Sequence, residues 1–155
     1  MKNEYDFLPT QTIEKGRELG YSPEKLSLLF LAPFLKVAWA EGFVQAGEQR
    51  AILRFAESLR LAPGKPGYER LLEWFDERPT DEYLDRSIED LRDLLATIPF
   101  KQAARLRSML QFGCVEVAHA AGDIGILRGR SNIRREEREE LRHIGERLGL
   151  SHASV

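Results

Sequence analysis

The chain has 155 residues, of which 43% are hydrophobic and 31% are charged. This length and composition indicate one folded domain with a buried core and argue against a disordered chain. The 23 basic and 25 acidic residues leave a net charge of −2, so no overall field would draw the molecule to nucleic acid or to anionic lipid.

Cysteine content and hydropathy predict the setting of the protein. The single cysteine, Cys114, excludes an intrachain disulfide and a cysteine-based metal cage. The first residues lack the apolar core of a signal peptide. The most apolar run, residues 26–40, is interrupted by Pro33 and Lys36 and is too short to cross a bilayer. We therefore expect a cytoplasmic protein that neither binds nucleic acid nor inserts directly into a membrane.

Helical periodicity runs through the chain, and no long stretch alternates with a period of two. The sequence therefore predicts an all-α fold, a single-domain bundle of about seven helices over residues 1–155, with residues 1–9 as a loosely ordered lead. The first expected helix ends at residue 19. The other six cover residues 23–41, 46–61, 68–76, 83–96, 100–121 and 134–149.

Local signals mark several of these helices. Thr10 or Thr12 is a possible cap for the first helix, and Ser22 followed by Pro23 is a strong start signal for the second. The second helix is apolar almost all round, so we expect other helices to surround it, with a kink or a break at Pro33. Phe112 lies opposite the main apolar stripe of residues 100–121, which predicts that this helix is also central.

One stretch occurs twice. Residues 37–42 read Val-Ala-Trp-Ala-Glu-Gly, and residues 117–122 read Val-Ala-His-Ala-Ala-Gly, 80 positions later. The amphipathic segments that follow also match, but at an offset of 89, as between Glu48 and Glu137, so the second copy carries nine extra residues in its turn. We interpret this as a helix-turn-helix unit used twice and packed face to face.

These residues resemble the TerB-like domain of tellurite-resistance proteins. The resemblance lies in an Ala-x-Ala-[Asp/Glu]-Gly-x-Val turn, a glutamate shortly after it and a helix ending in Leu-x-Leu, and it covers roughly residues 25–150. It implies an all-α bundle with internal pseudo-symmetry, a link to tellurite resistance and the stress response, and metal binding by the turn acids without enzymatic activity. The chain departs from the family pattern at Glu41, where aspartate is usual, and at Ala121, which replaces the acid in the second copy.

Two interpretations of the turn acids stay open. Carboxylates that converge on one point can hold a divalent cation such as Ca²⁺, Mg²⁺, Mn²⁺ or Zn²⁺. If the two units pack antiparallel, the candidate ligands come together from both turns. Alternatively, the acids serve only as helix caps, because a helix N-terminus favours anions. The candidate metal ligands are Glu41, Glu48, Asp123, Glu136 and Glu137.

Two weaker patterns also have ordinary structural interpretations. Glu116 with His119, and Glu140 with His143, have the Glu-x-x-His spacing of di-iron bundles, but His143 lies off the apolar stripe of its helix. The arginines of residues 128–135 are a possible phosphate site, although the acids that follow them can pair with them along the helix. Cys114 lies on an apolar stripe, where a thiol is usually inert packing.

The functional expectation is a non-enzymatic TerB-like protein that binds a divalent cation, a protein partner, or both. Its rival is a helical interaction module without metal, and a di-metal carboxylate protein is a distant third.

Overall fold

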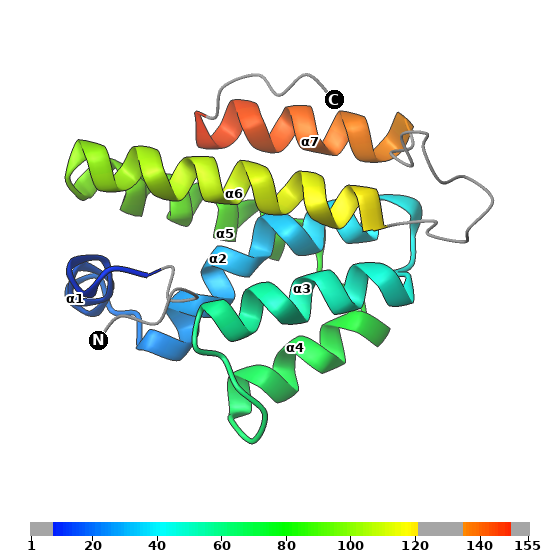
Figure 1. The fold of residues 1–155 in the computed structure, drawn as a ribbon, viewed down its shortest axis with the longest axis horizontal. Helices are drawn as coiled ribbons and strands as arrows, with labels where there is room; N and C mark the ends of the chain where they lie inside the picture. Colours follow the sequence, from blue (N-terminus) through cyan, green and yellow to red (C-terminus); the bar gives the residue numbers. More distant parts are fainter. Residues whose placement is uncertain (1–7, 121–134, 150–155) are drawn as a thin grey trace.

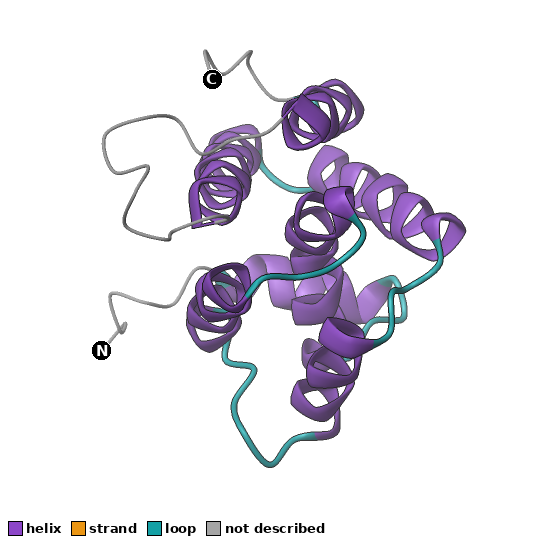
Figure 2. Ribbon diagram, turned by 90° about the vertical axis from the view of Figure 1, so that its right-hand side faces the viewer, coloured by secondary structure: helices purple, strands orange, loops and turns teal. Residues whose placement is uncertain are grey.

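The computed structural model describes residues 8–120 and 135–149, and within these ranges it contains helices and no strand (Figure 2). The all-α prediction is therefore confirmed. In chain order the helices are α1 (Thr10–Glu18), α2 (Pro23–Ala38), the short 3-10 helix η1 (Trp39–Glu41), α3 (Ala46–Ser58), α4 (Pro66–Asp76), α5 (Asp81–Thr97), α6 (Phe100–Ala120) and α7 (Arg135–Leu148).

Helix α2 is the centre of the bundle, as its apolar sequence predicts. It contacts all six other α-helices as well as η1 (Figure 1). Eleven of its residues are buried, including Pro33, and the helix runs without a break through that proline. The buried Ser27 hydroxyl has a hydrogen-bond partner inside the bundle, because it donates to the Leu59 carbonyl oxygen at 2.8 Å.

Side-chain caps begin two of the helices, α2 and α5, whereas the cap predicted for α1 is absent. The Ser22 hydroxyl accepts from the Lys25 N–H at 3.2 Å, and the Thr80 hydroxyl accepts from the Tyr83 N–H at 3.1 Å. Pro9 is the residue before α1, so the prediction of a Thr10 or Thr12 cap is wrong. Thr12 is fully buried instead, and its hydroxyl donates to Gln102 Oε1 on α6 at 2.6 Å.

Within the described part of the chain, helix α6 buries one face. Cys114 lies on the buried stripe, whereas Phe112, on which the prediction of a central helix partly rested, is 61% exposed. The residue between them, Gly113, sets the approach of α6 to α2: a Cβ there would lie 2.6 Å from the Phe34 ring. The tight contact explains why a glycine is tolerated in the middle of a long helix.

The two helix-turn-helix units lie side by side with their corners at the same end of the molecule. In Figure 1, α2 and α6 end on the right, where α3 and α7 begin, so the units are not antiparallel. Contacts between α7 and η1 bring the start of the second unit's outer helix against the first unit's corner. Within the described residues, no helix is long and apolar enough to span a membrane.

Candidate functional site

The first corner is built by a glycine. Helix η1 ends at Gly42, which has φ of 91°, and its N–H donates to the Trp39 carbonyl oxygen at 2.9 Å. This left-handed conformation favours glycine, and it turns the chain sharply into the loop before α3. Trp39 is buried and its indole N–H donates to the Trp74 carbonyl oxygen at 2.9 Å, which fixes η1 against α4. Glu41 and Glu48 therefore flank a sharp turn whose first side is anchored to α4.

Glu48 is the most unusual acid of this corner. It lies in the first turn of α3, is only 2% exposed, and its Oε1 accepts from the Gln45 N–H at 2.9 Å. Burial raises the pKa of Glu48 to about 7, the hydrogen bond from Gln45 opposes that rise, and the nearby charge of Glu41 adds to it. Glu48 is thus a helix cap that titrates near neutral pH.

Two more carboxylates are drawn inwards at the same end. Glu41 is half-buried with its Oε1 closed off from solvent, and Glu137 is 1% exposed with its Oε2 closed off. Glu137 occupies the first turn of α7, as Glu48 does in α3, so the repeat relationship predicted from the sequence places a buried glutamate at the same point of both units.

The second corner meets the first through backbone. At Gly47, in the first turn of α3, a Cβ would lie 2.5 Å from the carbonyl oxygen of Ala120, the last residue of α6. Residues 121–134, and with them Asp123, lie outside the described part of the chain. The described neighbourhood nevertheless shows that the α6 terminus and the acidic turn are adjacent.

Four of the five predicted ligands, all but Asp123, lie in the described part of the chain, and they are not grouped there as a metal site. Glu41 and Glu48 are close enough for their charges to interact, whereas Glu136 is exposed on the outside of α7. In residues 8–120 and 135–149, no three histidine, cysteine, aspartate or glutamate side chains are grouped so as to hold a metal ion. What the described corner offers a cation is therefore one pair of carboxylates.

The other two constellations receive no support from their positions. His119 and His143 are both exposed, so the two Glu-x-x-His pairs do not face a common interior site. Of the predicted basic segment, only Arg135 is described, and it pairs with Glu139 at 3.4 Å on the surface of α7. Cys114 is fully buried, as expected for a packing residue, and burial raises the pKa of its thiol.

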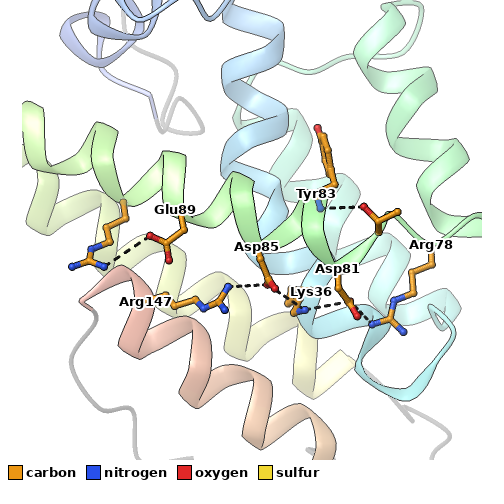
Figure 3. Close-up of polar contacts among 9 residues, drawn as sticks. Lys36, Arg78, Asp81, Tyr83, Asp85, Glu89 and Arg147 are labelled. Atoms are coloured by element: carbon orange, nitrogen blue, oxygen red, sulfur yellow. Dashed lines mark hydrogen bonds and ion pairs between the residues drawn. The ribbon is translucent and has the colours of Figure 1, made fainter.

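The structure also contains an ion-pair network that the sequence did not reveal. Lys36 of α2 is largely buried, and its Nζ lies 3.3 Å from carboxylate oxygens of both Asp81 and Asp85 on α5 (Figure 3). Arg147 of α7 contacts Asp85 at 2.8 Å, and Arg78 contacts Asp81 at 2.8 Å. Lys36 lowers the pKa of Asp81, with a smaller contribution from Arg78. The network joins α2, α5 and α7.

Only one signal pointed to this network, namely a lysine inside an apolar helix. Such a residue needs a partner, but its partners lie more than 40 positions away in sequence, as the separation between Lys36 and Asp81 shows. A small cavity of about 190 Å³ adjoins the network and is lined in part by His143 and Glu140. We assign the network a structural role in joining helices.

Comparison of the chain with protein-family models, with curated proteins and with solved structures gave no match.

Proposed function

We propose that the protein is a non-enzymatic, TerB-like binding domain that holds a divalent cation at the corner formed by Glu41 and Glu48. The observation that carries this proposal is the burial of Glu48 beside a second carboxylate, Glu41, at a glycine turn. The role in the stress response and tellurite resistance implied by the sequence resemblance belongs to the same proposal.

The chemistry of the pair favours a hard cation. Burial of the Glu48 carboxylate raises its pKa, and the nearby charge of Glu41 makes a smaller contribution to that rise. A divalent cation between them would replace the proton and stabilise both charges. Two carboxylates with water as the remaining ligands is the arrangement that Mg²⁺ commonly uses, since it dehydrates reluctantly. Binding would therefore release a proton near neutral pH.

A second candidate is a helical interaction module whose acids serve only as caps. The hydrogen bond from the Gln45 N–H to Glu48 favours it, because a capping role fully accounts for Glu48. It does not account for Glu41, which takes no part in that hydrogen bond and whose charge opposes the ionisation of Glu48. The two candidates therefore differ in what they require of Glu41.

Calorimetric titration with Mg²⁺, Mn²⁺, Ca²⁺ and Zn²⁺ tests the proposal. We expect the wild type to bind at least one of these ions with proton release, so that the heat varies with the ionisation enthalpy of the buffer. Glu41→Gln is the decisive variant, because it removes a ligand and leaves the Glu48 cap in place. It should weaken binding by about tenfold or more, since a charged ligand is lost.

The matched control is Glu57→Gln, an exposed glutamate on the same helix as Glu48. It should bind like the wild type. Heat from none of the four ions would overturn the cation proposal and leave the capping module in its place. Equal binding by the wild type and Glu41→Gln would show that any cation site lies elsewhere.

A further inference from the structure

A groove of about 550 Å³ lies between the first half of α2, α4 and the first half of α5, away from the acidic corner. Leu28, Leu29 and Trp74 line its apolar part, and Tyr83 forms part of its wall. Leu29 and Trp74 belong to the core, whereas Tyr83 is 45% exposed. The volume falls in the range of about 300–1,000 Å³ that is usual for ligand sites.

The aromatic side of the groove is held in place by its neighbours. The rings of Trp74 and Tyr83 lie 5.4 Å apart in a tilted arrangement, and the Arg70 guanidinium lies 5.6 Å from the Trp74 ring. Figure 3 shows the Tyr83 ring pointing away from the ion pairs of Lys36 and Asp81, so the network does not use it. An ordered aromatic wall with an exposed edge is the kind of surface that receives an apolar anchor residue.

The charges available in the groove are positive. Lys25, Arg70 and Arg86 line it, and within the described residues neither Lys25 nor Arg86 makes an ion pair. Arg70 pairs with Glu73 at 3.1 Å on the exposed surface, where such a pair is weak. Three cations thus gather on one surface of a chain whose net charge is −2.

The two acids that line the groove already have partners. Glu24 accepts from the Gly67 N–H at the start of α4, and a Cβ at Gly67 would displace the Glu24 side chain, whose Cγ would lie 2.5 Å away. Asp90 accepts from the Tyr21 hydroxyl and helps to raise its pKa, after the larger effect of burial.

We propose that this groove binds an acidic segment of a partner protein, with one bulky apolar side chain of that segment placed against Trp74 and Tyr83. Carboxylates on either side of the anchor would pair with Lys25 and Arg86, which the fold leaves available. This partner site is independent of the cation corner, because it uses the opposite half of α2 and no residue of the acidic turn.

Fluorescence anisotropy with labelled synthetic peptides of about a dozen residues tests this proposal. The first probe carries a central leucine flanked by glutamates, the second replaces the glutamates by lysines, and the third replaces the leucine by serine. We expect saturable binding of the first probe only. Lys25→Glu/Arg86→Glu should weaken it by about tenfold or more, because both exposed cations are reversed. Tyr83→Ala should weaken it without changing its dependence on salt.

Two controls separate this result from trivial outcomes. Lys101→Glu/Arg142→Glu makes the same change in net charge at exposed positions of α6 and α7, and should bind the first probe within about twofold of the wild type. Glu41→Gln should also bind it normally, so that failure of the cation proposal leaves this test intact. Circular dichroism verifies that every variant is folded.

Three outcomes would overturn the proposal. The first is a failure of the acidic leucine peptide to bind saturably at concentrations up to about 1 mM. Binding weaker than that has a free energy too small for specific recognition. The second is equal loss of binding in Lys25→Glu/Arg86→Glu and in its control pair. The third is sedimentation showing that the groove is covered by a second copy of the chain, with Tyr83→Ala releasing monomers.

Discussion

The backbone carbonyl of Ala120 lies against Gly47, so that the last turn of α6 rests on the first turn of α3. A Cβ at Gly47 would come within 2.5 Å of that carbonyl oxygen. Because the obstacle is backbone rather than the end of a flexible side chain, neither partner can move without shifting a helix. This contact joins the two helix-turn-helix units at their corners.

Gly47→Ala should therefore destabilise the protein. In a helix without such a neighbour, alanine is favoured over glycine by about 0.5–1 kcal/mol. Here the methyl group must push α6 away, and we expect a net loss of about 1–3 kcal/mol in the free energy of unfolding. Urea denaturation followed by circular dichroism measures it. A gain in stability would show that the two helices are not in contact at this point.

The contribution of Glu48 to the stability of the protein should fall as pH rises from about 4.5 to about 7. The folded state raises the pKa of Glu48 from 4.5 to about 7, so between these values the folded protein binds more protons than the unfolded chain. Ionising Glu48 in place should cost about 1–3 kcal/mol. Urea unfolding across this pH range gives the slope, and Glu48→Gln should reduce it while Glu57→Gln should not.

Lys36→Met should raise the pKa of Asp81 towards its ordinary value. Lys36 is the largest cause of the lowered pKa of this exposed aspartate, and Arg78 is a smaller one. Arg78→Met should therefore raise it less. Carboxyl-detected NMR titration compares the two variants. A larger effect from Arg78→Met would contradict the arrangement in Figure 3.

Cys114 should not react with a thiol reagent in the native protein. It is 2% exposed, and burial raises the pKa of its thiol, so the reactive thiolate is absent. The reaction rate with a disulfide reagent should rise by several orders of magnitude in urea, when the thiol becomes accessible. Fast labelling without denaturant would show that α6 opens readily in the native state.

Much of the fold follows from patterns within single segments. The apolar run of α2 predicts its central position, and Ser22 with Pro23 predicts where it begins. The repeat predicts two corners and a glutamate at the same point after each, and both Glu48 and Glu137 are buried. These features succeed because helix periodicity and capping are local properties that a sequence displays directly.

The features that sequence reasoning missed depend on distant partners. Thr12 is a residue type that often caps helices, but its hydroxyl donates a hydrogen bond to Gln102, 90 positions away, instead. Phe112 is apolar without being buried, because none of the helices in residues 8–120 and 135–149 covers that side of α6. The groove near Trp74 draws its lining from α2, α4 and α5, and no single segment shows a motif for it.

The way α7 is held has a consequence for access to the acidic corner. Ile144 and Leu148 are the buried apolar side chains of that helix, and Leu141 packs partly buried against the core. Polar contacts join Arg147 to Asp85, and the Leu148 carbonyl oxygen to Arg107 at 3.2 Å. A segment with so little apolar anchorage opens at low energy compared with global unfolding. Transient release of α7 would uncover η1, so ionic strength, which weakens the polar ties, should set how often solvent reaches Glu41.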